Sequence, residues 1–284
     1  MIAIVHGRVR PEEKLLFDAA ERLGVPVRSV PDSELVLGMD GIDADAVLVR
    51  SVSATRGLAI SHACHAAGIP VVNTPHVAAT CMDKAATSWA LRRAGVPTPD
   101  VRVAFTAAAA LTALDGLGYP AVIKPVQGSW ARMVSRVRDR AEAEQLLEHR
   151  EMLPNPVQHV HYIQPYIDTS HDGGHRDVRA FVIGGEPIAA IERHAPHWIT
   201  NTARGATAKG LAIDDELADL CRRASDAVGG GILALDLMHG PDGLVVHEVN
   251  HTMEFRNSIH TTGVDIPAKM VEHVAAVARR EVVA

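Results

Sequence analysis

The sequence predicts an α/β protein with a doubly wound sheet at its N-terminal end. Over the first eighty residues, strand-like runs alternate with helical runs, from IAIVHG through PEEKLLFDAAERLGV to IPVVN. Near the C-terminus, the runs ILALDLMHG and LVVHEVN carry acidic and amide side chains where a core strand would carry none. Because a buried carboxylate is costly unless it is paired or holds a metal, this second feature points to a functional site.

The composition argues against several classes of protein. The 284 residues include 34 acidic and 28 basic side chains, and the net charge of -6 gives no reason to expect nucleic-acid binding. The cysteines Cys64, Cys81 and Cys221 lack metal-ligand spacing, as expected for reduced thiols in a cytoplasm-like compartment. No uninterrupted apolar run reaches ~18 residues, so we expect a cytoplasmic protein without a membrane span or signal peptide.

The remaining elements can be placed in order along the chain. The first helix has Pro11 at its start and Gly24 at its end, and no G-x-G-x-x-G follows the first strand. One linking helix is expected to run through CMDKAATSWALRRAG and to stop before Pro97. Strands and helices alternate over 97–168, and a hairpin follows over 177–193. The chain closes with an irregular segment over 198–210, a helix over 214–230, the C-terminal strand pair and a helix over 265–283.

The turn sequence HGPDGL predicts the register of the C-terminal strand pair. A three-residue loop, 241–243, would form a type I turn followed by a left-handed glycine. That register sets Asp236 opposite Glu248, with Asn250 projecting from the same face. A two-residue loop would instead set Asp236 against His247, which explains the acidic residues poorly.

Two carboxylates that face each other repel, and a bound divalent cation is the simplest compensation. Asp236, Glu248 and Asn250 offer only oxygen ligands, which favour Mg²⁺ or Mn²⁺ over zinc. The alternative is a solvated outer face whose charges are neutralised by nearby arginine and lysine side chains. The spacing alone leaves both interpretations open.

Cationic side chains that could bind phosphate precede this face in the sequence. Lys124 lies in the aliphatic strand AVIKPV, where an inward-pointing lysine needs an anion, and Lys84 opens the linking helix. Arg179 and Arg193 lie on the two strands of the hairpin, whose register the sequence leaves open. Backbone N–H groups of the 128–129 loop could close over a phosphate. Each cation taken singly could also be a surface charge.

In this order, the motifs resemble those of an ATP-grasp ligase. They are Lys84, VIKP, the Gly128 loop, YIQPYI, RDVRAFVIGG, Arg193, NTARG, Asp236 and EVNHTMEF. NTARG followed by EVNHTMEFRNS is specific for the RimK-like branch and, within it, for the LysX group. The resemblance covers essentially the whole chain. It implies an N-terminal Rossmann-like domain over 1–83, a central ATP-lid subdomain over 84–168 and a C-terminal ATP-grasp subdomain over 169–284.

The resemblance also implies roles for individual residues. Two lysines would bind the ATP phosphates, a loop would cover the phosphates, and the backbone of a hinge would bind adenine. The residues expected to contact ATP are Lys84, Lys124, Gly128, Ser129, Trp130, Gln164, Tyr166, Ile167 and Arg179. Two Mg²⁺ ions, or Mn²⁺, would be held by Asp236, Glu248 and Asn250. The groups around the reacting carboxylate and γ-phosphate would be Arg193, Asn201 and Arg204. Substrate contacts are expected from His197, Thr202 and Asn257; the other histidines lack the partners of a zinc site.

The implied reaction is an ATP-dependent ligation. Transfer of the γ-phosphoryl group to a carboxylate makes an acyl phosphate, which an amine attacks to give an amide, ADP and phosphate. In the LysX group the carboxylate belongs to the C-terminal glutamate of a small acidic amino-group carrier protein, and the amine is that of 2-aminoadipate, as in lysine biosynthesis, or of glutamate. We expect no nucleic-acid or membrane partner, and a homo-oligomer, either a dimer or a tetramer.

Two features of the sequence leave alternatives open. After NTARG the LysX group continues with a second glycine and an acidic, Cys-Pro-containing segment, whereas this chain has ATAKG over 206–210. A glutamate-type or unusual amino acid is therefore an alternative substrate. The alternative functions are RimK-like glutamate addition to another protein or cofactor tail, and a non-catalytic nucleotide-binding regulator.

The second feature is a row of arginines at even spacing. They would share one strand face, which is either solvated or docks an acidic carrier: Arg132, Arg136, Arg138 and Arg140.

Overall fold

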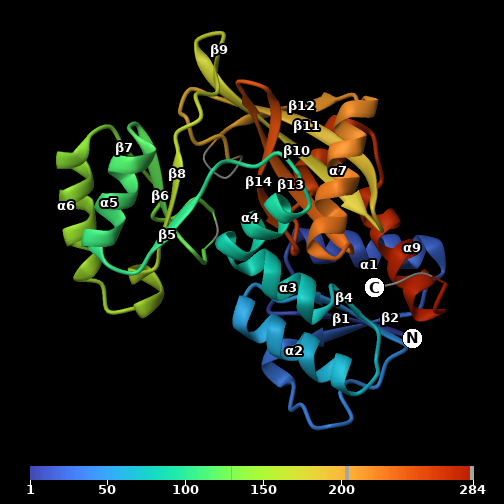
Figure 1. Cartoon of the computed structure of the whole chain (residues 1–284). Helices are drawn as coiled ribbons and strands as arrows, with labels where there is room; N and C mark the ends of the chain where they lie inside the picture. Colours follow the sequence, from blue (N-terminus) through green and yellow to red (C-terminus); the bar gives the residue numbers. More distant parts are fainter. Residues whose placement is uncertain (129, 202–204, 282–284) are drawn as a thin grey trace.

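Three sheets organise the chain in the computed structural model, which describes residues 1–128, 130–201 and 205–281 (Figure 1). The predicted α/β architecture is confirmed. In the view of Figure 1 the N-terminal sheet lies at the bottom, the central part with α5 and α6 at the left, and the C-terminal sheet at the upper right.

The N-terminal sheet is parallel, with strand order β2-β1-β3-β4. Its strands are β1 (Ile2–His6), β2 (Val27–Pro31), β3 (Ala46–Arg50) and β4 (Val71–Val72), and its helices are α1 (Pro11–Leu23) and α2 (Ala54–Ala66). All five residues of β1 are buried, because helices cover both faces of the sheet. As predicted, α1 begins at Pro11 and ends at Gly24, which adopts a left-handed conformation with φ of 64°.

The linking region consists of two helices, so the prediction of a single helix is wrong. They are α3 (Pro75–Met82) and α4 (Lys84–Arg93). Asp83 interrupts them with an extended backbone, and its side chain accepts hydrogen bonds from the N–H groups of Ala85 and Ala86. An aspartate in this role begins a new helix rather than continuing the old one.

The central part forms an antiparallel sheet with strand order β5-β8-β6-β7. Its elements are β5 (Arg102–Ala104), α5 (Ala107–Leu117), β6 (Ala121–Pro125), β7 (Ser135–Val137), α6 (Arg140–Glu151) and β8 (His161–Pro165), with 3₁₀ turns at Pro156–His159 here and Asp32–Glu34 earlier in the chain. Leu114, Ile123, Leu147 and Ile163 form a core of its own beneath α5 and α6. This part can therefore be treated as a separately packed lid.

The row of arginines does not share one face of a strand. β7 ends at Val137, and Arg140 is already the first residue of α6, so the alternation stops after Arg136. Arg138 pairs with Glu142, and Arg140 pairs with Glu144 at 2.8 Å and with Asp115. Arg132 precedes β7, so only Arg136 of the four lies on the strand, and the prediction that they share one strand face is wrong.

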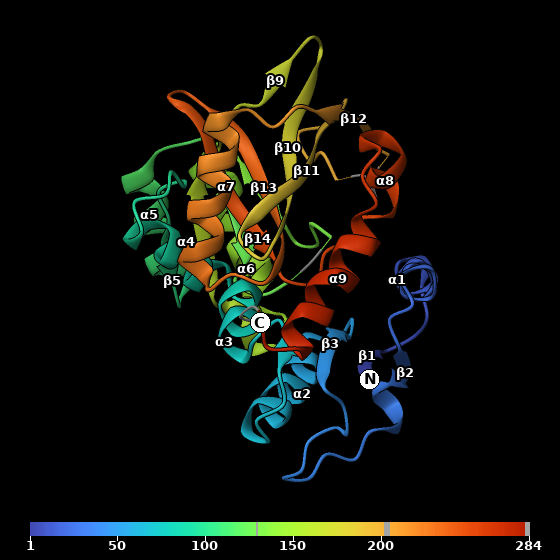
Figure 2. The same cartoon turned by 90° about the vertical axis from the view of Figure 1, so that its right-hand side faces the viewer.

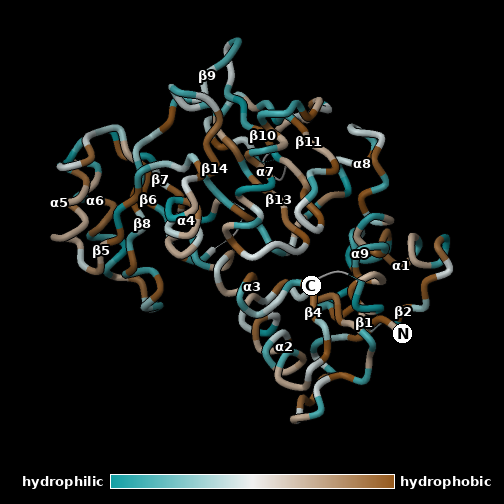
Figure 3. Tube along the Cα trace, turned by 45° about the vertical axis from the view of Figure 1, so that its right-hand side comes forward, coloured by the Kyte–Doolittle hydropathy of each residue, from teal (hydrophilic) through white to brown (hydrophobic). Residues whose placement is uncertain are grey.

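The C-terminal sheet has the strand order β12-β11-β10-β13-β14, and β9 pairs with β10. Its elements are β9 (Ser170–His171), β10 (Gly174–Ile183), β11 (Glu186–Ala195), β12 (Thr207–Leu211), α7 (Asp215–Val228), β13 (Ile232–Gly240), β14 (Gly243–Asn250), α8 (Arg256–Thr262) and α9 (Ile266–Ala278). The expectation of an irregular segment up to residue 210 is wrong, since β12 pairs along β11. Hydrophobic stretches run along the inner strands in Figure 3, whereas the β9 hairpin is largely hydrophilic.

The face of this sheet opposite α7 changes character along β10. Asp177, Arg179, Phe181 and Ile183 are two residues apart, so their side chains share that face. Phe181 and Ile183 are buried in a core that includes residues of α9 and of the N-terminal sheet. α9 packs against α1 and β3, as Figures 1 and 2 show. The half of this face around Phe181 and Ile183 is therefore part of the hydrophobic core. The half around Asp177 and Arg179 is polar and faces the lid.

In the hairpin of β13 and β14, Asp236 pairs with Glu248 as predicted, but the loop and the register differ from the prediction. Gly240 pairs with Gly243, so the loop has two residues and not the predicted three. The register then shifts between Asp236 and Leu237, which leaves His247 as an extra residue on β14. This bulge restores the Asp236–Glu248 pair that a two-residue loop alone would have lost.

Candidate active site between the lid and the C-terminal sheet

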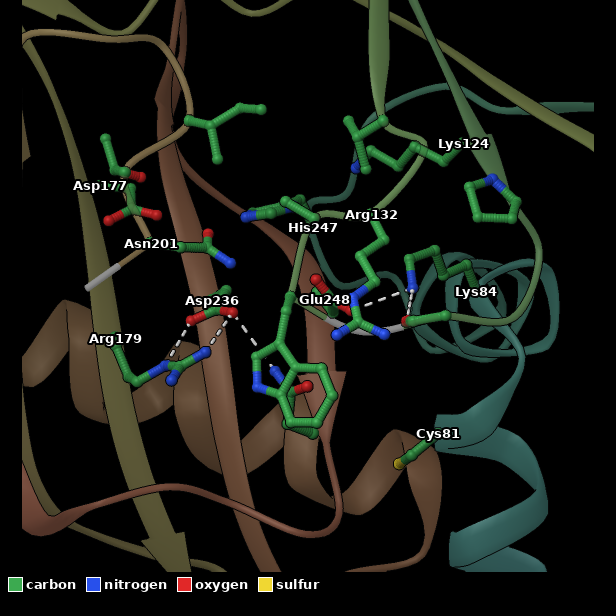
Figure 4. A pocket seen from close by; sticks show the side chains of 18 of the residues that line it. Cys81, Lys84, Lys124, Arg132, Asp177, Arg179, Asn201, Asp236, His247 and Glu248 are labelled. Carbon is green, nitrogen blue, oxygen red and sulfur yellow. Dashed lines mark hydrogen bonds and ion pairs between the residues drawn. The ribbon is translucent and has the colours of Figure 1, made fainter. Parts of the chain in front are cut away.

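A cavity of about 290 Å³ lies between the lid and the polar half of the C-terminal sheet. Both sides contribute predicted residues to its lining (Figure 4): Lys84, Lys124, Gly128, Trp130, Gln164, Tyr166, Ile167, Arg179, Arg193, Asn201, Asp236, Glu248 and Asn250. Residues predicted from motifs scattered over most of the chain thus meet at one place.

Asp236 is the centre of a buried ion-pair network. It accepts hydrogen bonds from Nε and Nη2 of Arg179, both at 2.7 Å, and from Nη2 of Arg193 at 3.1 Å. Asn250 Nδ2 donates to the same carboxylate at 3.2 Å. Burial alone would raise the pKa of Asp236, but the charges of Arg179 and Arg193 outweigh it and hold the pKa well below its usual range. The carboxylate is therefore ionised at neutral pH.

Glu248 is compensated from the other side of the cavity. Its Oε1 lies 3.1 Å from Lys84 Nζ, which also donates to the carbonyl oxygen of Gly128 at 2.8 Å (Figure 4). Burial acts to raise the pKa of Glu248, but Lys84 and other neighbouring cations bring it below its ordinary value. Lys84 thus connects the carboxylate face to the loop at the edge of the lid.

Asp177 is a site residue that the sequence reasoning missed. It pairs with Arg193 across β10 and β11, and its Oδ1 accepts from Arg193 Nε at 2.7 Å. Both side chains are almost fully buried, at 3% and 2% exposure. The signal was available, because Asp177 precedes Arg179 by two residues and so shares its strand face. Asp177 fixes the guanidinium that faces Asp236.

His247 is the second missed residue, and the bulge explains its position. Val246 and Val249 are both buried in the core beneath α7, although they are three residues apart. His247 and Glu248, between them, therefore both line the cavity on the opposite face. Neither ring nitrogen of His247 has a hydrogen-bond partner among the described residues. Burial, and secondarily Lys124, lower the pKa of His247 to about 4, so the imidazole is neutral at neutral pH.

Lys124 projects from β6 of the lid toward the same cavity. It is 6% exposed, and its Nζ donates to Oε1 of Gln164 at 2.9 Å. Burial lowers the pKa of Lys124 to about 8, because desolvation disfavours the charged ammonium. A phosphate in the cavity would supply the anion that this lysine lacks.

Aromatic and cationic side chains join the lid to the C-terminal part near the predicted hinge. The guanidinium of Arg136 on β7 lies 4.8 Å from the ring centroid of Tyr166 and 5.9 Å from that of Trp198. Arg132 lies 5.1 Å from the ring centroid of Trp130. The backbone of Trp130 has a φ of 56°, a conformation that non-glycine residues rarely adopt. The loop after β6 thus places the side chains of Trp130 and Arg132 at the wall of the cavity, and its backbone is strained at Trp130.

Two of the predicted substrate contacts, His197 and Asn257, do not line this cavity. Asn257 lines a second, adjoining cavity. His197 lines neither, and its Nδ1 accepts a hydrogen bond from the backbone N–H of Ile199 at 3.0 Å. Ser129, Thr202 and Arg204 lie outside the described residues.

The donor set facing the cavity fits a hard divalent cation. Asp236 and Glu248 are opposite each other, Asn250 adds an amide, and all three offer oxygen ligands. Over 1–128, 130–201 and 205–281, no group of three histidine, cysteine, aspartate or glutamate side chains is placed to hold a metal. A set of carboxylate and amide oxygens suits Mg²⁺ or Mn²⁺, which also accept phosphate ligands, better than zinc.

Comparison with known families identifies the domains that carry this site. Residues 81–274 match the RimK-like ATP-grasp domain, and residues 2–80 match the LysX pre-ATP-grasp domain. The chain belongs to the RimK-like ATP-grasp family. It is accordingly an ADP-forming carbon–nitrogen ligase, and the predicted ATP-grasp fold with an N-terminal pre-ATP-grasp domain is confirmed. ATP-grasp ligases use ATP and Mg²⁺.

Individual relatives of this ligase match over almost its whole length. The α-aminoadipate–LysW ligase LysX of Saccharolobus solfataricus is 34% identical over 94% of this chain and 98% of its own. The glutamate–LysW ligase ArgX of Sulfurisphaera tokodaii is 33% identical over 96% of this chain and 97% of its own. The two identities are nearly equal, so they do not choose between the two amino acids.

Solved structures show the same fold. A RimK domain ATP-grasp protein from Sphaerobacter thermophilus has a TM-score of 0.78 at 27% identity, covering 96% of this chain and 99% of that one. The ATP-grasp ligase PsnB, in complex with its minimal precursor, Mg and ADP, has a TM-score of 0.74 at 20% identity, covering 98% and 97%. Within the described parts of the ligase, no helix is long and apolar enough to cross a membrane.

Proposed function

We propose that this ligase joins the α-amino group of an amino acid, either 2-aminoadipate, glutamate or an analogue, to a carrier protein. The acceptor carboxylate would be the side chain of the C-terminal glutamate of a small, acidic amino-group carrier protein. The proposal is carried by one observation: the acidic face and the cations of the lid meet in one cavity of a chain similar to LysX and ArgX over nearly its full length.

The residues of the cavity divide the work of the reaction. We propose that Lys84 and Lys124 bind the phosphates of ATP, with Gly128, Ser129 and Trp130 above them. Gln164, Tyr166 and Ile167 would hold adenine. Two Mg²⁺ ions, or Mn²⁺ in their place, would bind at Asp236, Glu248 and Asn250 and offset the phosphate charge.

The arginines would position the reacting carboxylate. A carboxylate is a poor acyl donor, because oxide would have to leave. Its oxygen instead attacks the γ-phosphorus, the bond to the β-phosphate oxygen breaks, and ADP leaves. Arg193, which Asp177 holds in place, would stabilise the charge on the transferring group together with Arg179, Asn201 and Arg204.

Amide formation completes the reaction. The amine nitrogen bonds to the acyl carbon, the bond from that carbon to the phosphate oxygen breaks, and phosphate leaves with the electron pair and takes the remaining proton. Water must stay out of the cavity, because it would hydrolyse the acyl phosphate, and the lid loop over the cavity provides that cover.

An intact-mass assay tests this function. The enzyme would be incubated with MgATP, a carrier protein ending in glutamate, and either glutamate or 2-aminoadipate. We expect the carrier to gain the mass of one amino acid less water, only with ATP, and the added mass identifies the substrate. ADP release without a change in the carrier would favour a RimK-like ligase acting on another protein or cofactor tail. No ADP release with any acceptor would favour a nucleotide-binding regulator.

We also propose that the ligase is cytoplasmic and forms a dimer or a tetramer. The location rests on the cysteines, which lack metal-ligand spacing, and on the lack of a long apolar run, whereas the assembly rests on the resemblance to the LysX group. Mass photometry at nanomolar concentration would give the number of subunits.

A further inference from the structure

A second cavity, also of about 290 Å³, adjoins the first. It lies where the turn between β1 and α1 meets the start of α8 and the strands β10 and β11. Arg10, Arg179, Arg193 and Glu254 line both cavities, so the two are neighbours that share a wall. A ligand in the second cavity would therefore lie next to the arginines of the reaction site.

The second cavity is rich in arginine although the chain as a whole is acidic. Its charged lining consists of Arg8, Arg10, Arg179, Arg193 and Arg256 against Glu12 and Glu254. Three of these arginines are bound to buried carboxylates: Arg10 to Glu13, Arg179 to Asp236 and Arg193 to Asp177. Arg8 and Arg256 are the remaining two.

These two arginines have free hydrogen-bonding capacity. Arg8 makes no hydrogen bond or ion pair with any residue that the structure describes, and Arg256 has only a 4.0 Å ion pair with Glu12. Free guanidinium groups at the wall of a cavity are suited to bind carboxylates, because each can donate two parallel hydrogen bonds.

Glu12 is a largely buried carboxylate whose one ion pair among the described residues, with Arg256, spans 4.0 Å. Its side chain is 7% exposed, and it forms no hydrogen bond with another described residue. The adjacent Glu13, by contrast, accepts hydrogen bonds from Arg10 at 2.8 and 2.9 Å and from Arg50 at 3.2 Å. Buried carboxylates normally have such donors, so a carboxylate at a cavity wall that lacks them is suited to accept hydrogen bonds from a cationic ligand.

We propose that the second cavity is the binding site of the incoming amino acid, with Glu12 accepting hydrogen bonds from the α-ammonium group and Arg8 and Arg256 each binding a carboxylate. The inference rests on the proposed function and assigns the position of its second substrate. A ligand with one ammonium and two carboxylates matches in charge one carboxylate and two guanidinium groups that form no hydrogen bond with any described residue. Arg179 and Arg193 line both cavities, so the bound amino acid would lie next to the site of the activated carboxylate.

Hydroxylamine separates this site from the activation chemistry. It is a small, uncharged nucleophile that traps an acyl phosphate as a hydroxamate and needs no carboxylate-binding groups. In Arg8→Gln and Arg256→Gln, we expect the KM for the amino acid to rise by at least about tenfold, while carrier hydroxamate still forms at the wild-type rate. Arg28→Gln is the matched control, because this exposed arginine on β2 lines neither cavity and, among the described residues, donates only to the Asp43 carbonyl oxygen.

Glu12→Gln adds a readout that a structural role would not give. Removing a buried charge that makes only a 4.0 Å ion pair among the described residues should leave the melting temperature unchanged or raised, whereas amino-acid transfer should fall with hydroxamate formation retained. Unchanged KM values in all three variants would overturn the inference, and so would a parallel loss of hydroxamate.

The inference can be judged even if the proposed function fails. That failure would appear as a wild-type enzyme that forms neither amide nor hydroxamate on a carrier. Glutamate and 2-aminoadipate would then be titrated calorimetrically into the enzyme with MgADP. Binding that Arg8→Gln and Arg256→Gln weaken would support the site, whereas absent or unaffected binding would overturn it.

Discussion

One extra residue, His247, gives the acidic face its geometry. Without the bulge on β14, the two-residue turn would set Asp236 against His247, and Glu248 would point into the core beneath α7. With the bulge, His247 and Glu248 both face the cavity while Val246 and Val249 stay buried. The turn sequence predicted the correct pairing of Asp236 with Glu248 from an incorrect loop length. The loop is one residue shorter than predicted, and the one-residue bulge shifts the register back by the same amount.

Lys124 should make nucleotide binding depend on pH. Its pKa of about 8 means that the free enzyme loses this charge as the pH rises from 7 to 9. A phosphate binds the charged ammonium, so affinity for MgADP should fall above pH 8, by up to about tenfold per pH unit. Calorimetric titrations at pH 7, 8 and 9 would measure this. Lys124→Met should bind weakly at all three pH values, and a retained slope in that variant would assign the effect to another group.

Glu248→Gln tests the acidic face more cleanly than Asp236→Asn. Glu248 is held mainly by Lys84, so its neutral variant should keep its fold and lose ligation by about a hundredfold or more. Asp236→Asn should lose activity and also stability, by about 3 kcal/mol, because it leaves Arg179 short of its buried partner. ADP release and thermal unfolding measure the two effects. A Glu248→Gln enzyme with normal turnover would remove the metal assignment.

Among the elements, the lid depends on contacts at its edge as well as on its own core. Arg136, on β7, contacts Tyr166 at the hinge and Trp198 just before Asn201. The even spacing of the arginines predicted that Arg136 shares a strand face with the arginines before and after it. However, β7 is only three residues long, and α6 begins at Arg140. The short length of β7 therefore decided which arginines lie on the strand, and the spacing of the arginines in the sequence does not reveal that length.

Arg136→Gln should loosen the lid over the nucleotide. Losing a cation–π contact of about 0.5–1 kcal/mol should raise the KM for ATP by about two- to fivefold with little change in kcat. Arg138→Gln is the matched control, because that exposed arginine pairs with Glu142 and contacts neither ring. Equal effects of both variants on KM would indicate a general charge effect and not a contact of the lid edge.

At the scale of the whole molecule, the N-terminal and C-terminal parts share one hydrophobic core. α9 comes from the end of the chain, yet it covers the N-terminal sheet together with α1, and the same cluster includes Phe181 and Ile183 of β10. The boundaries at 83/84 and 168/169 remain our proposal for dividing the chain. The lid has a core of its own, and the N-terminal sheet adds a second cluster on its other face.

Met270→Ala should destabilise both parts in a single transition. Met270 is fully buried on α9, and removing such a side chain costs about 2–5 kcal/mol. Urea unfolding followed by circular dichroism would measure it, with the exposed Glu272→Ala as control. For the same reason, a fragment of residues 1–83 should not fold alone. Cooperative unfolding of that fragment would show that the shared core is dispensable.

The sequence by itself determined the local features of this protein. Strand and helix periods, the Pro11 and Gly24 signals and the oxygen-rich strand pair gave the α/β class and an acidic face, since each depends on neighbouring residues. The family resemblance added the ATP-grasp assignment. Motif order also predicted the residues of the cavity, from Lys84 to Asn250, before any of them could be placed together.

Only the tertiary structure decided which charges are paired and which are free. The register of β10 against β11 and β13 joined Arg193 to Asp177 and Arg179 to Asp236. The meeting of α1 with α8 left Glu12, Arg8 and Arg256 around a second cavity without a hydrogen bond to any residue that the structure describes. Long-range pairing and burial set these environments. They depend on contacts between residues up to about 240 positions apart, and no local pattern in the sequence encodes such contacts.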